Sequence, residues 1–564
     1  MLEDVQAGQW HPRGAPRAAL LMAARTSNDG PAGVPLVAPA TLAGWLTDGA
    51  ELALLDAREQ GVFFHDHLFH AACVPLSHLE LELPRLVPRR TTRTVWCDDG
   101  FGDLAVRAAN RALELGWSDV HVLDGGVAAW AGSGREVYSG VNVPSKAFGE
   151  SVEHRYGTPR IPAADVKQLL ADGADLVILD ARPIEEFRRM NIPTGTDCPG
   201  AELVHRVKQV VTSTQTLVVV NCAGRTRSII GCQSLVNAGL ENPVMALENG
   251  TMGWELAGYD VERGRDDHAP APGPQARSWA RSAADRVGQR FGVGHIDHDR
   301  LDAMLADRDR TTCLLDVRTP DEFTAGHLPG SRPAPGGQLV QATDEYIATR
   351  HARLVLIDDD GVRATMTASW LRQLGWRDAV VLDHALDGRQ LEVGRPARPQ
   401  DASAAASPTI RVSDLADRLD EPGLAVLDLG TSIKYRERGH VPGAWWGVRS
   451  RLGAARESIG AVTTLVLTST DGRLAQLAVE DARRCWPGTA VLALAGGTKS
   501  WRHAGRSMES GFTRPTTDPN DVWYKPYDHE GDVVADHMND YLAWEIALVD
   551  QIGRDPTVHF PTFP

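Results

Sequence analysis

The 564-residue sequence is poor in cysteine, and its seven cysteines include no CxxC pair. They stand at positions 73, 97, 198, 222, 232, 313 and 485, an odd number without the close spacing of a disulfide framework or a zinc site. No run approaches the ~18 apolar residues that a membrane-spanning helix needs, and the first residues do not read as a signal peptide. We therefore expect a cytoplasmic protein with reduced thiols, no metal, no cofactor and no membrane contact.

Positive charge is also in short supply. The 58 Lys and Arg are outnumbered by 74 Asp and Glu, giving a net charge of −16. Such a balance argues against a nucleic-acid-binding surface, although local arginines can still hold a small anionic substrate. Hydrophobic residues make up 43% of the chain and charged residues 23%, which is ordinary for globular domains. The length predicts about three to five such domains.

The sequence contains a fourfold internal repeat. An apolar run ends in an acidic residue at Asp56, Asp180, Asp316 and Asp428. Forty-two positions after each of these stand Asp98, Cys222, Asp358 and Thr470, and a tryptophan closes three copies at Trp130, Trp254 and Trp501. Shared spacing of this kind predicts four similar domains. Only the second copy has a cysteine at the shared position.

The repeat and the lapses between copies set the expected domain boundaries. We expect an N-terminal arm (1–34), domain 1 (35–140), domain 2 (155–263), domain 3 (281–392), domain 4 (408–510) and a C-terminal tail (511–564). Residues 139–160, 264–280 and 393–408 are expected to be connectors. The stretch Arg17–Arg25 is a candidate short helix.

The tail is predicted to contain a helix from Asp532 to about Ile552. Helical spacing would place Val534, Met538, Leu542 and Ile546 near one face. We favour docking of this face onto a neighbouring domain over a role in partner binding.

Within domain 2, helices and apolar strands alternate. The pattern predicts a helix over 162–170, strands over 175–180, 216–221 and 243–247, and a helix from Ser228 that ends at Gly239. Strands that are apolar throughout are buried on both faces. The sequence therefore predicts an α/β fold, with a mainly parallel sheet flanked by helices in each domain.

The segment around Cys222 is the strongest candidate site. It joins a strand to a helix through the loop Cys222, Ala223, Gly224, Arg225, Thr226, Arg227, followed by Ser228. Inward-facing N–H groups and a helix N-terminus favour an anion in such a loop. With two arginines added, we expect the pKa of the thiol to fall well below its usual value of about 8.5. The thiolate would then be a nucleophile beneath an anionic substrate.

Several motifs of the repeat resemble those of the rhodanese homology domain. The third copy has the most complete opening motif, Leu315-Asp-Val-Arg-Thr-Pro-Asp-Glu-Phe-Thr-Ala-Gly-His-Leu-Pro-Gly330. Shorter forms are Leu55-Asp-Ala-Arg58, Leu179-Asp-Ala-Arg-Pro-Ile-Glu-Glu-Phe187 and Gly439-His-Val-Pro-Gly-Ala444, and Gly-Gly…Trp closures stand at Gly125-Gly126…Trp130 and Gly496-Gly497…Trp501. The resemblance covers about residues 35–510.

The resemblance implies four tandem rhodanese-like domains and a sulfurtransferase. Cys222 would be the catalytic residue, carrying sulfur as a persulfide, with Ala223–Arg227 binding the substrate. Asp180, Arg182 and Ser228 would support the loop, the first two by structural pairing. The related phosphatases have a Cys-x5-Arg loop that is one residue longer than Cys222–Arg227, so the shorter loop favours sulfur over phosphoryl chemistry.

The implied donor is thiosulfate or a small persulfide, with cyanide or a cellular thiol as acceptor. Mercaptopyruvate is the alternative donor. A competing hypothesis is a non-catalytic module that docks a sulfur-carrier protein or senses persulfide, suggested by the three degenerate copies and the aromatic-rich tail.

Other residues are secondary candidates. A one-residue slip would make Cys97 the nucleophile of domain 1, and Cys198 could resolve a persulfide. Cys232 is expected to serve in packing. Glu202 and His205 are candidates for the rim of the site.

Two further patterns are expected to carry no chemistry. Domains 3 and 4, with Asp358 and Thr470 at the shared position, are expected to be inactive. The group His65, Asp66, His67 and His70 lacks a second set of metal ligands at fixed spacing.

Overall fold

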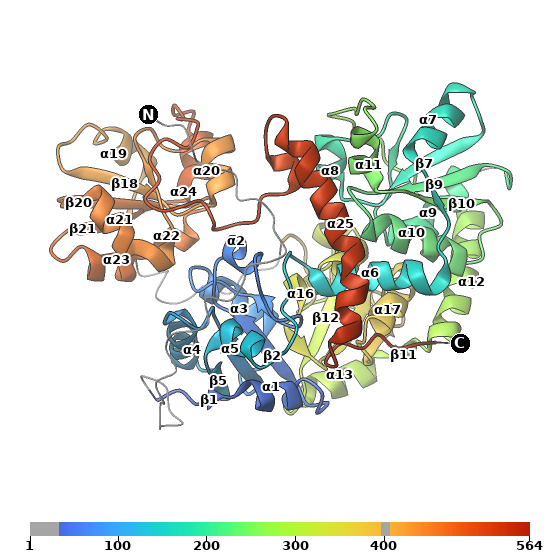
Figure 1. Cartoon of the computed structure of the whole chain (residues 1–564), viewed down its shortest axis with the longest axis horizontal. Coiled ribbons are helices and arrows are strands. Elements are labelled where there is room, and N and C mark those ends of the chain that lie inside the picture. Colours follow the sequence, from blue (N-terminus) through green and yellow to red (C-terminus); the bar gives the residue numbers. More distant parts are fainter. Residues whose placement is uncertain (1–32, 212, 396–406, 564) are drawn as a thin grey trace.

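The computed structural model describes residues 33–211, 213–395 and 407–563, which form four α/β domains and a C-terminal segment (Figure 1). The expected N-terminal arm and the candidate helix Arg17–Arg25 lie outside these residues. Each domain has a central parallel sheet with helices on both sides, as predicted. Among the described residues, no helix combines the length and apolar character needed to cross a bilayer.

The four sheets share one strand order. Their middle strands are almost wholly buried, because helices cover both faces. In the order of the sheets, domain 1 has β1 (Leu36–Val37), β5 (Val120–Leu123), β4 (Arg93–Cys97), β2 (Leu52–Asp56) and β3 (Ala72–Cys73); domain 2 has β6 (Arg160–Ile161), β10 (Val244–Leu247), β9 (Leu217–Asn221), β7 (Leu176–Asp180) and β8 (Thr196–Asp197). Domain 3 has β11 (Gly294–Ile296), β16 (Ala379–Leu382), β15 (Arg353–Ile357), β12 (Thr312–Asp316) and β13 (Arg332–Pro333); domain 4 has β17 (Thr409–Ile410), β21 (Ala490–Leu494), β20 (Thr464–Thr468), β18 (Leu424–Asp428) and β19 (Trp445–Trp446).

Strand register fixes which residues of the four copies are equivalent. The acidic strand ends pair with the next strand as Asp56 with Cys97, Asp180 with Asn221, Asp316 with Ile357 and Asp428 with Thr468. The positions that follow are therefore equivalent: Asp98, Cys222, Asp358 and Ser469. Ser469, and not Thr470, is the domain 4 equivalent of Cys222, because that copy is one residue shorter between the two strands.

Helices fill the connections between strands. Those of domains 1 and 2 are α1 (Pro39–Trp45), α2 (Gln60–Phe63), α3 (Leu79–Leu86), α4 (Leu104–Glu114), α5 (Gly126–Gly132), α7 (Ala163–Ala171), α8 (Ile184–Arg189), α9 (Glu202–Val210), α10 (Thr226–Asn237) and α11 (Gly250–Leu256). Those of domains 3 and 4 are α13 (His298–Ala306), α14 (Pro320–Ala325), α15 (Gly336–Gln341), α16 (Thr343–Tyr346), α17 (Val362–Gln373), α19 (Val412–Ala416), α20 (Ser432–Arg438), η1 (Arg449–Arg451), α21 (Leu452–Ile459), α22 (Arg473–Leu477), α23 (Val479–Cys485) and α24 (Gly497–His503).

Two of the expected connectors contain helices. The segment 139–160 contains α6 (Val143–Tyr156), and α12 (Pro274–Phe291) begins inside 264–280. Pro144 and Pro274 stand in the first turns of these helices, where a backbone N–H has no acceptor within the helix and its absence in proline costs no hydrogen bond. These two prolines, which favoured the prediction of connectors, therefore lie at the beginnings of helices.

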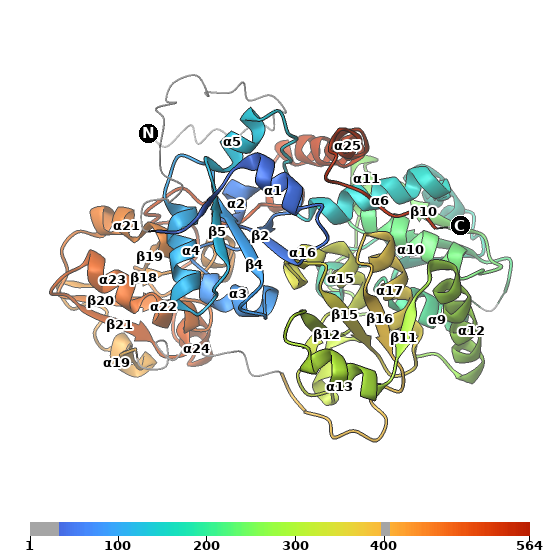
Figure 2. The ribbon, with the colours of Figure 1, turned by 90° about the horizontal axis from the view of Figure 1, so that it is seen from below.

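Strand pairing and helix packing connect the domains, in addition to the covalent chain. From domain 3, β14 (Thr349–Arg350) adds an antiparallel strand to the sheet of domain 1, with Thr349 opposite Ala53. Helix α12 packs against both α9 of domain 2 and α17 of domain 3. Figure 2 shows α6 and the tail helix α25 (Val533–Arg554) lying together along the side of this assembly.

The tail docks onto the domains as favoured from its sequence, through a face that only partly matches the predicted one. It has a short turn, η2 (Pro526–Asp528), before α25. Met538 and Leu542 are buried as expected, whereas Ile546 is 51% exposed. Trp544, Glu545 and Leu548 are buried instead, because α25 contacts α6 as well as domain 2.

Candidate active site

Cys222 lies at the junction predicted from the sequence. Strand β9 ends at Asn221, and α10 begins at Thr226. The Cys222 Sγ donates to Ser228 Oγ at 3.5 Å, and this hydroxyl donates to the carbonyl of Arg225 at 2.8 Å. Ser228 therefore ties the thiol to the turn of the loop.

The loop rests on the start of α11. The N–H of Thr251 donates to the carbonyl of Cys222 at 2.8 Å, and the N–H of Met252 donates to that of Ala223 at 2.9 Å. A Cβ at Gly250 would lie 2.5 Å from the Cys222 carbonyl oxygen. This close approach requires the glycine of the Asn249-Gly250 pair.

Asp180 and Arg182 lie beneath the loop as expected. Arg182 makes two hydrogen bonds to Asp180, at 2.8 and 2.7 Å, and Asp180 also accepts from Asn221 Nδ2 at 2.8 Å. Since Asn221 precedes Cys222, the pair braces the start of the loop. The same pair recurs as Asp56–Arg58 and Asp316–Arg318, in domains without the cysteine. Its recurrence supports a structural role.

The equivalent loops of the other domains hold a polar side chain where domain 2 has its sulfur. In domain 1, Asp98 accepts from the N–H groups of Gly100 (2.8 Å) and Ala105 (3.0 Å). In domain 3, Asp358 accepts from those of Gly361 (2.7 Å) and Ala364 (3.0 Å).

Domain 4 follows a weaker form of the same pattern, with Ser469 Oγ accepting from Ala475 N at 3.3 Å. The loop of this fold thus presents main-chain donors to an anion, and in domains 1 and 3 a carboxylate of the chain fills that place.

The two loop arginines have different surroundings. Arg225 pairs with Glu150 at 2.7 Å and with Glu153, both on α6, so its guanidinium is turned towards that helix. Arg227 pairs with Glu186 of α8 at 2.8 Å and contacts Gln338 of domain 3 at 3.1 Å. The carboxylates of α6 hold Arg225, and substrate binding by this arginine stays a prediction.

Helix α25 covers the loop. Met538 and Leu542 pack against Ala223 and Met252. A Cβ at Gly224 would lie 3.3 Å from Glu545 Oε2 and 3.4 Å from Tyr541 Cε1. Under this cover Cys222 is only 2% exposed.

The electrostatics of Cys222 differ from the prediction. Burial raises the pKa of its thiol, and the negative charge of Glu545 adds to this, while Arg227 and hydrogen bonds from Ser228 lower it. The net shift is upwards, so the expected low pKa is not found with α25 in place. The sequence could not show this, since the charge of Glu545 and the side chains that cover the loop come from a helix more than 300 residues away.

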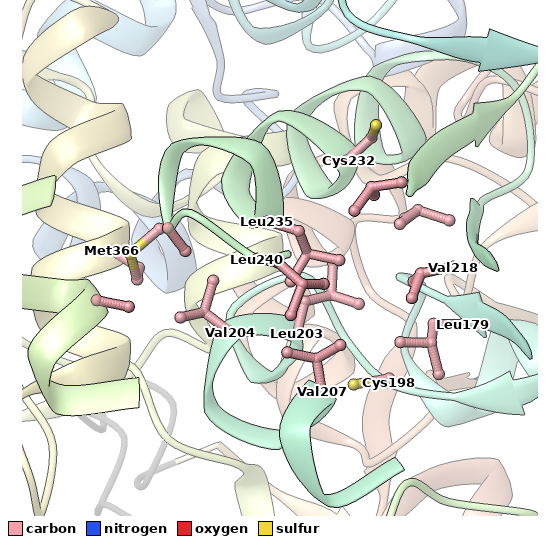
Figure 3. Packing of buried hydrophobic residues seen from close by; sticks show 14 of the residues in the cluster. Leu179, Cys198, Leu203, Val204, Val207, Val218, Cys232, Leu235, Leu240 and Met366 are labelled. Carbon is pink, nitrogen blue, oxygen red and sulfur yellow. The ribbon is translucent and has the colours of Figure 1, made fainter. Parts of the chain in front are cut away.

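Cys97, Cys198 and Cys232 lie in the hydrophobic cores of their domains. Cys97 is fully buried among the residues that pack β4 against α1 and α5, and its register makes it the counterpart of Asn221, so the one-residue slip is wrong. Cys198 lies beside Val207 and Leu179, and Cys232 shares the same core (Figure 3). Packing of Cys232 is confirmed. Cys198 points into the core and not at the loop, which contradicts a resolving role.

Glu202 and His205 lie at the interface with domain 3 and not on the rim of the site. Glu202 pairs with Arg363 at 2.8 Å, and His205 Nε2 lies 3.2 Å from Asp360 Oδ2. Of the histidine-rich group, Asp66 pairs with Arg58, His67 stacks on Phe63, and His70 contacts Arg350. Throughout the described part of the chain, no group of three or more His, Cys, Asp or Glu side chains is arranged to hold a metal ion.

Three residues that lie near the loop have no motif or spacing in the sequence that indicates this position. They are Glu545 and Tyr541 of α25, and Lys146 of α6, whose ammonium lies 5.2–5.4 Å from the rings of Trp523, Tyr541 and Trp544. The aromatic-rich tail was a signal that the segment packs, but its spacing held no information on which surface it would cover.

Comparisons with known proteins agree with the repeat. A family model described as "Rhodanese-like domain" matches residues 38–133, 162–257 and 297–390. A crystal structure of a thiosulfate sulfurtransferase from Pseudomonas aeruginosa is 46% identical, with a TM-score of 0.90, over 94% of this chain and 100% of that one. No curated protein sequence gives a significant match.

Two solved structures align with about one domain each. A rhodanese-related protein from Thermoplasma volcanium is 19% identical over 18% of this chain and 97% of its own, with a TM-score of 0.17. The BH2092 protein from Bacillus halodurans is 20% identical over 20% of this chain and 81% of its own, with a TM-score of 0.18.

Proposed function

The chain belongs to the rhodanese-like family, and we propose that it is a sulfurtransferase in which Cys222 carries the transferred sulfur. The donor would be thiosulfate or a small persulfide, and the acceptor a thiol or cyanide. A sulfur-carrier protein is a further candidate acceptor.

One observation carries this proposal. The loops of domains 1 and 3 bind a carboxylate of their own chain through main-chain N–H groups, and the equivalent loop of domain 2 has a thiol in that position. A sulfur atom is a nucleophile and can be extended by a second sulfur, whereas a carboxylate cannot. A negatively charged persulfide on Cys222 would find the donors that the aspartates use in the other domains.

The reaction has two displacements. The Cys222 thiolate attacks the outer sulfur of thiosulfate, a new S–S bond forms, and sulfite leaves with the electron pair of the bond that breaks. An acceptor thiolate or cyanide then attacks the outer sulfur of the Cys222 persulfide, and the Cys222 thiolate leaves. Arg227, whose positive charge lowers the pKa of the thiol, would stabilise both thiolate and persulfide.

The burial of Cys222 favours a second candidate function. Because the thiol is 2% exposed, a donor reaches it only after a local opening of the site. The cover that α25 forms over the loop would suit a docking module that opens when a sulfur-carrier protein displaces the tail.

Intact mass after incubation with thiosulfate distinguishes these functions. An enzyme should gain one sulfur atom and lose it on addition of cyanide, with Cys222→Ser inert in both steps. If neither thiosulfate nor a small persulfide adds sulfur to the wild type, the sulfurtransferase proposal is wrong, and the module remains. Mercaptopyruvate should be included as the alternative donor.

A further inference from the structure

Glu545 is a buried carboxylate that comes from the tail but faces the catalytic loop of domain 2. It is 2% exposed. Its Oε1 accepts from Tyr541 Oη at 3.0 Å and from Thr226 Oγ1 at 3.3 Å, and Thr226 belongs to the Cys222 loop. Its Oε2 is buried without a hydrogen-bond partner and lies against Gly224.

An unpartnered carboxylate oxygen is costly to bury, by about 1–3 kcal/mol or more. Oε2 therefore needs an explanation that helix docking does not supply, because a glutamine would make the same two bonds through one oxygen. Oε2 faces the Cys222 loop at Gly224, two residues after the cysteine.

Four neighbouring ionisable groups affect the pKa of Glu545. Lys146 and Glu150 face it from α6, Arg225 from the loop, and Tyr541 from its own helix. Burial raises the pKa of Glu545, and Glu150 adds to this, whereas Lys146, Tyr541 and Arg225 lower it. A buried carboxylate whose pKa is raised is suited to accept and return a proton.

We propose that Glu545 is a catalytic residue of the domain 2 site, where its Oε2 takes the proton of a thiol acceptor. This assignment rests on the proposed function and specifies the acceptor as a thiol. As the acceptor S–H bond breaks, its proton moves to Oε2 and the thiolate attacks the outer sulfur of the Cys222 persulfide. The Cys222–S bond breaks, its electron pair stays on Cys222, and Oε2 returns the proton to that thiolate. No oxidant or reductant is consumed.

The test compares two acceptors on the same persulfide. Wild type and Glu545→Gln are loaded from thiosulfate, freed of donor, and discharged at pH 8 either to dithiothreitol or to sulfite. Sulfite has almost no proton to lose at this pH, and its charge is repelled by a carboxylate. Intact mass follows the loss of sulfur in a single turnover. Asp536→Asn, at an exposed position of the same helix, is the matched control.

We expect Glu545→Gln to slow discharge to dithiothreitol at least tenfold and to leave discharge to sulfite unchanged or faster. General base catalysis typically contributes about 10²–10⁴-fold. Asp536→Asn should behave as wild type with both acceptors. Equal slowing with both acceptors, or no slowing with either, would overturn the assignment while leaving the Cys222 persulfide intact. A wild type that takes up no sulfur would remove the proposed function and this assignment together.

A second measurement needs no variant, in case Glu545→Gln fails to fold. Wild-type discharge is measured at pH 7 with thiols of increasing pKa. Without a base, the rate should fall roughly threefold per unit of thiol pKa, because the thiolate fraction falls about tenfold while the nucleophilicity of the thiolate rises about threefold. With Glu545 as base, the rate should depend clearly less on thiol pKa, and the full threefold fall per unit contradicts the assignment.

Discussion

His205 of domain 2 and Asp360 of domain 3 contact each other across the interface, with Nε2 and Oδ2 3.2 Å apart. Asp360 belongs to the loop of domain 3 that corresponds to the Cys222 loop of domain 2. Three residues further on, Arg363 in the first turn of α17 pairs with Glu202 at 2.8 Å. A loop without a nucleophile thus serves as the contact surface of the neighbouring domain.

This contact makes stability depend on pH. Burial alone would lower the pKa of His205, but its hydrogen bonds with Asp360 and Glu202 raise it to about 9. Because the folded pKa lies above the unfolded value of about 6.5, the stabilisation is complete below pH 6.5 and is lost as pH rises through 9. Calorimetry of wild type and His205→Gln should show a Tm difference at pH 6 that shrinks by pH 10. A constant difference contradicts the ion pair.

Asp98 should stabilise domain 1 although it has no catalytic role. Asp98→Ala leaves the buried amides of Gly100 and Ala105 without their acceptor, which should cost about 1–3 kcal/mol in free energy of unfolding. The neighbouring Asp99 is exposed and accepts only from Phe101, so Asp99→Ala should cost under about 0.5 kcal/mol. Chemical denaturation followed by fluorescence measures both, and equal losses would refute the role of the loop amides.

The cover formed by α25 should limit the reactivity of Cys222. Leu542→Ala removes a buried side chain that packs on the loop, at a cost of roughly 2–5 kcal/mol to local packing. We expect iodoacetamide to label Cys222 several-fold faster in this variant, with an alkylation midpoint at lower pH, because less burial means a smaller upward pKa shift. Ile546→Ala, at an exposed position of the same helix, should label as wild type. Peptide mass spectrometry identifies the labelled thiol.

Substitution of Arg227 should mainly reduce activity, whereas substitution of Arg225 should mainly reduce stability. Arg227→Gln removes the charge that most lowers the pKa of the Cys222 thiol, so kcat/KM for thiosulfate should fall at least tenfold with little change in Tm. Arg225→Gln leaves Glu150 and Glu153 without their partner and should lower stability by roughly 3–5 kcal/mol. Steady-state kinetics and calorimetry on both variants separate the effects. A larger kinetic loss in Arg225→Gln at full folding would show that it reaches the substrate.

The fold and the strand–loop–helix arrangement at Cys222 are predictable because their signals are local or repeated. Buried strands such as β9 are apolar over their whole length, and the spacing from Asp180 to Cys222 recurs in the other copies. The same counting placed Thr470 one position too far, since spacing cannot detect a one-residue deletion that the pairing of Asp428 with Thr468 reveals. The sequence predicts connectors at 139–160 and 264–280, but helices begin in both segments. Proline cannot distinguish the two cases, because it is common both in connectors and in the first turn of a helix.

The sequence by itself determined four α/β repeats and the one copy that has a thiol at the end of its central strand, because chain direction, apolar runs and loop residues are set by neighbours along the chain. Only the tertiary structure decided that α25 covers the Cys222 loop, that Arg225 is held by α6, and that Glu545 reaches the loop. These depend on contacts between residues up to 319 positions apart. Burial and charge pairing are properties of such contacts, so the pKa of Cys222 has its origin in the assembled molecule.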